Sequence, residues 1–188
     1  MILDKEQFYQ TIITNYIITM MYIKTVTKLP LYSYLMIFLC IMVISSISGQ
    51  TLRQKKMEKL NFMIGEWVGT STSFKNDTIS KQVPAFEKIS YSLDKNLITI
   101  DLHSQSLQLH TVIYYNEKDE KFYYTPYSKR GTGTYPATYN EGEFTVWFSE
   151  KRRLIFRLTP EGNFQEYGEK LEKGIWSKYF EDILKKAP

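Results

Sequence analysis

The sequence predicts an all-β fold, an antiparallel up-and-down β-barrel of about ten strands with a short helix before the first strand. From residue 66 onward, apolar and polar residues alternate as in half-buried strands, and clusters of turn-forming residues interrupt the pattern. No helix is expected between the strands. A parallel sheet is therefore excluded, because its crossovers need about a dozen residues or more. An open meander would expose two long edges, which closure into a barrel removes.

The helix is expected within residues 51–63, where Met57, Leu60 and Met63 recur at helical spacing, and it should end at Gly65. A two-sheet sandwich is the alternative architecture, but an apolar helix before the first strand favours a barrel, which needs a plug at one mouth. The ten expected strands are residues 66–74, 86–93, 97–104, 108–115, 121–127, 134–139, 143–149, 153–159, 164–171 and 176–184.

The first 49 residues are expected to lie outside this domain. Residues 35–44 are ten consecutive apolar residues, preceded by Lys24 and Lys28 and followed by small residues. This order is typical of a secretory signal peptide, and the apolar core is short for a bilayer span of roughly 20 residues. Further apolar residues at 12–23 leave an uncleaved membrane anchor as the alternative.

Met20 and Met21 directly precede the basic flank, so we expect translation to start at one of them, with residues 1–19 an extension. Cleavage after Gly49 would make Gln50 the first residue of a secreted or periplasmic protein. Without cleavage the protein would be anchored in the membrane. Cys40 lies inside the apolar core after Phe-Leu, a context that does not match a lipoprotein acylation site.

Residues 50–188 are expected to form one domain, since 139 residues can enclose a real core. Three of the 24 basic and two of the 20 acidic residues precede Gln50, which leaves 21 and 18 in the domain. The two signs are interspersed, so nucleic acid is not an expected partner. The domain has no cysteine for disulfides or thiolate chemistry. We expect a monomer or homodimer.

Gly65-Glu66-Trp67 matches the Gly-x-Trp signature at the first strand of lipocalin and calycin barrels. The longer run from Leu60 to Gly69 resembles bacterial lipocalin-like proteins of unknown function and the nitrobindins, which are ten-stranded calycin-type barrels. Residues 114–118 and 164–169 resemble the fourth-strand turn and ninth strand of that bacterial family. The resemblance covers most of residues 50–188. It implies a calycin-like barrel in which Gly65, Trp67 and Gly69 are structural.

In calycin barrels this tryptophan packs across the closed end against an arginine or lysine from a late strand. The resemblance therefore implies that Trp67 contacts Arg157 or, as second candidate, Lys178.

The resemblance to nitrobindins implies haem binding through a histidine near the end of the barrel. This chain departs from that pattern, because its two histidines are His103 and His110. Tyrosine can ligate ferric haem, and the later strands contain several tyrosines. These candidates are Tyr123, Tyr124, Tyr127, Tyr135 and Tyr139. No cofactor is predicted, and haem lacks support from the sequence.

A metal site or acid–base pair is the functional interpretation of Asp101, His103 and His110. In a hairpin of residues 97–104 and 108–115, Asp101 and His103 share one face and His110 lies opposite Asp101. The alternative, which the sequence favours, is that this face points outward, because Ile100 and its apolar neighbours occupy the other face.

The stretch 122–139 is rich in tyrosine and contains two prolines and two glycines. It is either a mobile aromatic lip that grips a ligand or simply two strands and a loop, and the second interpretation is favoured. Lys129 and Arg130 beside it are candidates to attract an acidic head group, although solvated loop charge is the default.

The expected function is binding of a small, partly apolar ligand inside the barrel, without catalysis. Serine-hydrolase, metalloprotease and nucleotide-binding motifs are absent, and no catalytic residue is predicted. The candidate ligand-binding residues are Tyr91, Tyr114, Tyr124, Tyr127, Arg130, Trp147, Arg157 and Glu166. One alternative is a haem-binding, nitrobindin-like protein or an isomerase-type enzyme, by fold analogy. Another is an interaction module of the cell envelope.

Overall fold

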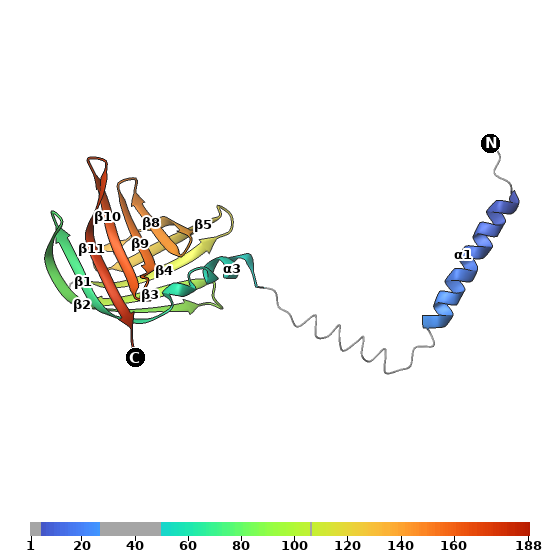
Figure 1. Ribbon diagram of the computed structural model, residues 1–188, viewed down its shortest axis with the longest axis horizontal. Coiled ribbons are helices and arrows are strands. Elements are labelled where there is room, and N and C mark those ends of the chain that lie inside the picture. Colours follow the sequence, from blue (N-terminus) through green and yellow to red (C-terminus); the bar gives the residue numbers. More distant parts are fainter. Residues whose placement is uncertain (1–4, 27–49, 106) are drawn as a thin grey trace. The chain divides into compact units, whose positions relative to one another are not determined.

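The structure, a computed structural model, describes residues 5–26, 50–105 and 107–188 (Figure 1). The chain divides into two units, residues 1–49 and 50–188. In the first unit, helix α1 (Lys5–Val26) includes both Met20 and Met21. Among the described helices, none combines the length and apolar character needed to cross a membrane. The predicted apolar core at 35–44 and the cleavage position at Gly49 lie outside the described residues.

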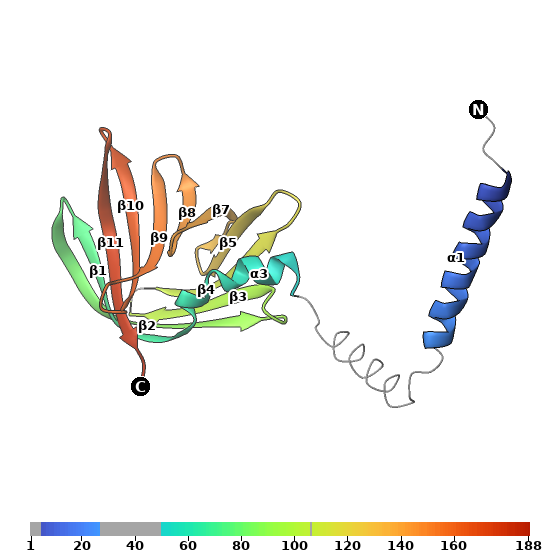
Figure 2. The same ribbon diagram turned by 45° about the vertical axis from the view of Figure 1, so that its right-hand side comes forward.

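Residues 50–188 form a closed antiparallel β-barrel of ten strands (Figures 1 and 2), which confirms the predicted fold class. Each strand pairs with its neighbour in sequence, β1 pairs with β11, and β4 pairs with β5 to complete the ring. The two-residue β6 (Gly131–Thr132) only extends the edge of β5. The ring strands are β1 (Gly65–Lys75), β2 (Thr78–Ser92), β3 (Leu97–Ser104), β4 (Gln108–Asn116), β5 (Lys121–Ser128), β7 (Tyr135–Asn140), β8 (Glu143–Ser149), β9 (Arg152–Leu158), β10 (Phe164–Glu172) and β11 (Ile175–Lys186).

The largest difference from the predicted strands is the start of β2, at Thr78 instead of residue 86. Residues 78–82 are exposed and pair with β1 alone, so their sequence shows no apolar alternation. Pro84 lies before the first pair of β2 with β3, Ala85–Ser104, so its missing N–H breaks no bond to β3. The tyrosine-rich stretch 122–139 forms parts of β5 and β7 with β6 between them, in agreement with the strand interpretation.

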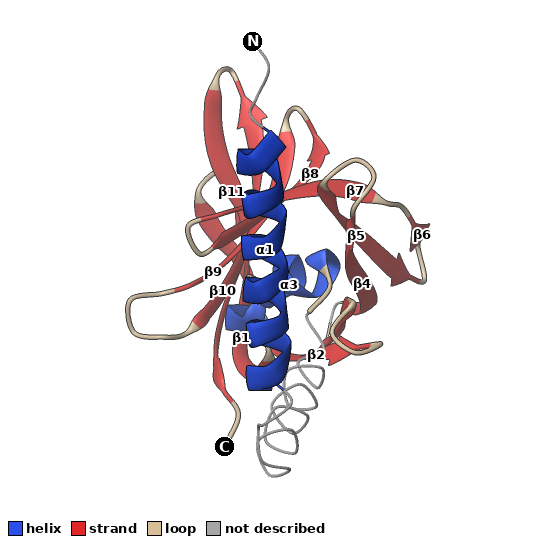
Figure 3. Cartoon of the chain, turned by 90° about the vertical axis from the view of Figure 1, so that its right-hand side faces the viewer, coloured by secondary structure: helices blue, strands red, loops and turns tan. Residues whose placement is uncertain are grey.

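Helix α3 (Leu52–Glu58) and the three-residue 3-10 helix η1 (Asn61–Met63) cover one end of the barrel, which we call the helix end. Figure 3 shows α3 in blue against the strands. The helix begins at Thr51, whose side chain caps the Gln54 amide while the Gln54 side chain bonds back to Thr51. The expected single helix to Met63 is thus two short pieces, which bury Met57 and Met63 on the barrel interior.

Polar contacts tie α3 to two strand connections at this end. The Gln54 side chain donates to the Asp94 carbonyl in the β2–β3 turn at 2.8 Å. Glu117, in the β4–β5 turn, accepts from the Arg53 amide at 3.2 Å. The helix end therefore carries the β2–β3 and β4–β5 turns. The opposite end, the open end, carries the β3–β4, β8–β9 and β10–β11 connections.

Trp67 seals the helix end from inside the barrel. Its indole stacks on Phe164 with ring centroids 5.3 Å apart, and its N–H donates to the Met63 carbonyl at 2.8 Å. The expected contact with Arg157 or Lys178 is wrong. Both cations lie on the outer face against the ring of Tyr167, because strand alternation places Phe156 inward on β9 and Arg157 outward.

Two glycines of the signature have distinct structural reasons. Gly65 has φ +154°, and a Cβ there would lie 3.3 Å from the Trp67 indole. Gly69 has no unusual φ, but a Cβ would lie 2.2 Å from the Ile183 carbonyl oxygen of β11. The first glycine permits the entry into β1, and the second permits close approach of β1 and β11.

Apolar and aromatic side chains fill the interior next to the helix end. Phe144, Phe156 and Phe164 are fully buried there. Leu60, the residue just before η1, belongs to the same buried cluster at the helix end. A packed layer of this kind is a structural core.

Candidate functional site

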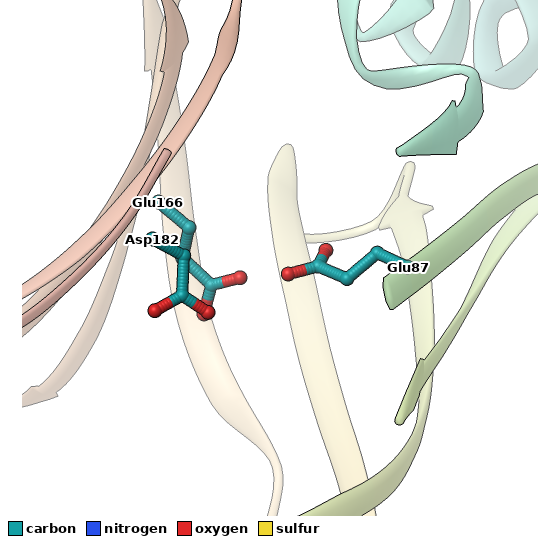
Figure 4. A group of neighbouring side chains, drawn as sticks. All are labelled: Glu87, Glu166 and Asp182. Atoms are coloured by element: carbon teal, nitrogen blue, oxygen red, sulfur yellow. The ribbon is translucent and has the colours of Figure 1, made fainter. Parts of the chain in front are cut away.

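Three acidic side chains lie inside the barrel: Glu87 on β2, Glu166 on β10 and Asp182 on β11. We call them the acid cluster (Figure 4). Their exposed fractions are 0%, 6% and 3%. Strand alternation places them there, since Glu87 stands two residues from buried Ala85 and Ile89 on β2.

The geometry of the acid cluster follows from strand register. Glu166 and Asp182 are direct cross-strand partners on β10 and β11. Glu87 points toward them from β2 (Figure 4), and one carboxylate oxygen from each residue lies within 4.8 Å of the others. Both oxygens of Glu87 and Oδ1 of Asp182 are buried without a hydrogen-bond partner. Buried polar atoms are normally paired, so this arrangement is exceptional.

Burial and mutual repulsion shift the proton affinities of the acid cluster upward. Burial, with the negative charge of Asp182 as the second cause, raises the pKa of Glu87 to about 8. Burial likewise raises the pKa of Asp182 to about 6, against the opposing effect of a contact from the Ser71 side chain. The pKa of Glu166 is well above its ordinary value because of burial and the charges of Glu87 and Asp182. The cluster therefore retains protons near neutral pH.

Two tyrosine hydroxyls lie close to Glu166. Tyr124, on β5, is buried and accepts a long hydrogen bond from Thr111 at 3.5 Å, while burial and the charge of Glu166 raise the pKa of Tyr124. Tyr179, on β11, accepts a bond from Arg152 Nε at 3.2 Å. Burial raises the pKa of Tyr179, and the hydrogen bond from Arg152 acts against that effect.

A pocket of about 280 Å³, the interior pocket, lies at the open end next to the acid cluster. Its wall is mostly apolar and aromatic, and Glu166 is the member of the acid cluster that lines it. The Arg152 guanidinium covers part of the rim, 4.7 Å from the centre of the Tyr179 ring and 5.7 Å from that of Phe148. The lining residues are Leu107, Leu109, Tyr124, Pro126, Phe148, Arg152, Leu154, Glu166, Tyr179 and Phe180.

Of the sequence-predicted ligand residues, the structure brings Tyr124 and Glu166 together in this pocket. Tyr91 is at the helix end instead, where its hydroxyl lies 3.4 Å from the Met57 carbonyl. The remaining candidates do not line the interior pocket. Tyr114 stacks on Tyr123 outside the barrel core, with ring centroids 5.4 Å apart.

Trp147 and Arg157, both predicted as ligand residues, are on the outer face. Trp147 packs against Arg153, whose guanidinium lies 5.7 Å from the indole centre, and Arg157 packs against Tyr167. Arg157 therefore does not line the interior pocket; it lines a separate pocket of about 390 Å³ together with Phe62 and Tyr139. Tyr127 is exposed, and Arg130 lies in the β5–β6 turn, where it and Lys129 line a separate pocket of about 390 Å³.

The Asp101 and His110 pair is on the outer face of the β3–β4 hairpin. Their carboxylate oxygen and Nδ1 lie 2.6 Å apart, and both side chains are about half exposed. His103 is on the same face, opposite Gln108, and is exposed. This placement agrees with the outward-facing interpretation. A metal ion would need three or more His, Cys, Asp or Glu residues whose ligand atoms lie close together. Among the described residues, the acid cluster is the group that meets this condition.

Glu87, Asp182 and Tyr179 were absent from the sequence-predicted site. A signal for Asp182 exists in the strand pattern. Asp182 stands between Phe180 and Leu184, which share one face, so a charged residue occurs at an inward position.

A tyrosine that ligates ferric haem does so as a tyrosinate. Burial raises the pKa of Tyr124 and of Tyr179, which opposes formation of a tyrosinate at either position while no metal is bound. The polar groups of the interior pocket instead suit a cation or a hydrogen-bonding molecule.

No protein-family profile matches the chain, and a search of curated proteins finds no match. The fold and the site therefore define the class: a closed ten-stranded antiparallel barrel, consistent with a calycin or lipocalin-like fold, with acidic side chains in its interior.

Proposed function

We propose that this protein is an exported barrel that binds a small, partly apolar molecule in its interior pocket without catalysing a reaction. The observation that carries the proposal is the interior pocket of about 280 Å³. Six of its ten lining residues are aliphatic residues, proline or phenylalanine, and the others supply polar atoms. Small-molecule sites commonly combine an apolar wall with a few polar groups that fix orientation.

The polar groups of the interior pocket set the orientation of the ligand. Glu166 and Tyr124 lie on its inner wall, and Arg152 lies at its rim. Because the pKa of Glu166 is raised, a protonated carboxyl group is available there to donate a hydrogen bond. A ligand with an apolar body and a hydrogen-bond acceptor at its inner end would match this arrangement.

Export is supported by the sequence before the barrel. The basic flank, the apolar segment 35–44 and the small residues up to Gly49 have the order of a signal peptide. The lack of cysteine in residues 50–188 is compatible with a secreted or periplasmic protein that needs no disulfide.

Native mass spectrometry of the full chain, purified from its own host, tests the proposal. Leu109→Trp should fill the interior pocket, whereas Ile175→Trp adds the same side chain at a position in β11 that is 71% exposed. We expect a bound molecule in the wild type and in Ile175→Trp, and its loss in Leu109→Trp with an unchanged circular dichroism spectrum. A wild type without adduct, or an adduct retained by folded Leu109→Trp, would overturn the proposal.

A further inference from the structure

We propose that Glu87, Glu166 and Asp182 form a binding site for a hard divalent cation of the Ca²⁺ or Mn²⁺ type at the inner end of the interior pocket. The proposal goes beyond small-molecule binding, because it assigns a second kind of ligand, a metal cation, to the acid cluster.

The spacing of the three carboxylates fits a cation shell. One oxygen from each residue lies within 4.8 Å of the other two. Calcium–oxygen distances are about 2.3–2.6 Å, so oxygens on opposite sides of one ion are about 4.6–5.2 Å apart. Donor sets made of carboxylates suit Ca²⁺, Mn²⁺ and Mg²⁺ better than zinc or copper.

The state of Glu87 is an independent sign of a missing partner. Its side chain is fully buried, and neither oxygen receives a hydrogen bond from a backbone, Lys, Arg or hydroxyl donor; its contact is with the carboxyl group of Glu166 inside the same cluster. Figure 4 shows its carboxyl group pointing at those of Glu166 and Asp182. Leaving a buried polar group unpaired opposes folding, and more strongly when the group is charged. A cation between the three residues would contact all three carboxyl groups at once, which the Glu87–Glu166 contact alone does not.

The charge balance of the site also calls for a cation. The ion pairs formed by described Lys, Arg and His residues all involve acids outside the acid cluster. The charges that shift the pKa of Glu87 and of Glu166 come from other acids of the cluster. Buried carboxylates that have no Lys, Arg or His in an ion pair can balance the charge of a divalent ion.

A route to the site exists through the interior pocket. Glu166 belongs both to the pocket wall and to the acid cluster, so an ion that enters at the open end reaches a carboxylate first. The helix end is closed by Trp67 and the residues packed on it.

Titration of the chelator-treated full chain with Tb³⁺, Ca²⁺ and Mn²⁺ tests the proposal. Terbium takes the same oxygen ligands as calcium, and nearby tyrosine sensitises its luminescence. Tyr124 interacts electrostatically with Glu166 and Glu87, so tyrosine excitation should give terbium emission that Ca²⁺ displaces. We expect saturable binding of one ion at pH 8, and binding at least tenfold weaker at pH 6, where protons compete for the carboxylates.

The nearly isosteric variants Glu87→Gln and Asp182→Asn should each weaken binding at least tenfold while keeping the circular dichroism spectrum. Glu181→Gln is the matched control, because Glu181 neighbours Asp182 in sequence and contacts Lys178 on the outer face. Equal loss in all three variants, or none in the first two, would place the ion elsewhere and overturn the proposal.

Absence of saturable binding at pH 8 would also overturn it. Calorimetry with hexylammonium chloride examines the competing occupant, an organic ammonium group. Binding of hexylammonium without any metal binding would replace the cation site with an amine site. Because these probes do not depend on the host ligand, failure of the metal site leaves the adduct experiment on the interior pocket intact.

Discussion

The two halves of the barrel interior differ in the side chains that they bury. Next to the helix end, phenylalanine, isoleucine and methionine side chains fill the space, and the buried Trp67 N–H has a partner in the Met63 carbonyl. Toward the open end, the acid cluster is buried with unpaired oxygens beside a pocket of about 280 Å³. One half is complete as a core, and the other retains both space and unpaired polar atoms.

This difference identifies the half in which function should be sought. Apolar packing stabilises a barrel, whereas a buried unpaired carboxyl group opposes folding. A leucine in place of Glu87 would continue the core that Ala85 and Ile89 begin on β2. Packing alone does not require acids at these positions, so we infer that they serve a binding site.

The largest effect should come from the packed half. Trp67→Ala would remove the stacking on Phe164 and the bond to Met63, and we expect the free energy of unfolding to fall by about 3–5 kcal/mol. Urea denaturation of the full chain, followed by circular dichroism, measures this loss. Trp147→Ala is the matched control on the outer face, where the indole packs against Arg153, and its cost should be about 1 kcal/mol. Similar losses in both variants would show that the helix end is not the dominant core.

The acid cluster should give a smaller effect that depends on pH. Glu87 has a pKa of about 8 in the folded protein and about 4.5 when unfolded, so the folded state binds its proton more tightly. Stability from this group is complete below about pH 4.5 and is lost as pH rises through about 8. Glu87→Gln does not titrate. In chelator, we expect it to match the wild type at pH 5 and to exceed its free energy of unfolding by about 3 kcal/mol at pH 9.

Urea denaturation at pH 5, 7 and 9 gives the three differences needed. Glu172→Gln, at the end of β10 where Glu172 pairs with Lys170, should show no growing advantage over this range. A constant difference between Glu87→Gln and the wild type at all three values would mean that Glu87 is solvated or paired in solution.

The packed half could be predicted from the sequence because alternation and turn chemistry are local. Nine of the ten ring strands start within two residues of the predicted position. The start of β2 was missed because residues 78–82 extend a hairpin beyond the ring and need no apolar face. The break between α3 and η1 was missed because Met57, Leu60 and Met63 keep helical spacing across it.

The other half was predicted less well, for two physical reasons. Glu87 follows Phe86, so apolar residues occur on both faces of β2 and conceal which face is inward. The meeting of Glu87 with Asp182 depends on strand order around the closed ring, which only long-range pairing sets. The outward placement of Arg157 was missed for a related reason, since one step of alternation on β9 separates the inner from the outer face.

The smallest effect should come from the mouth of the interior pocket. Leu107 lines the pocket at the open end and is 38% exposed, so Leu107→Ala removes few packing contacts and should lower the free energy of unfolding by less than about 1 kcal/mol. The same substitution at fully buried Leu60 should cost about 2–5 kcal/mol, because it leaves a cavity under the helix. Urea denaturation compares the two. Equal costs would mean that the open end is packed like the helix end, and the contrast between the two halves would then lose its basis.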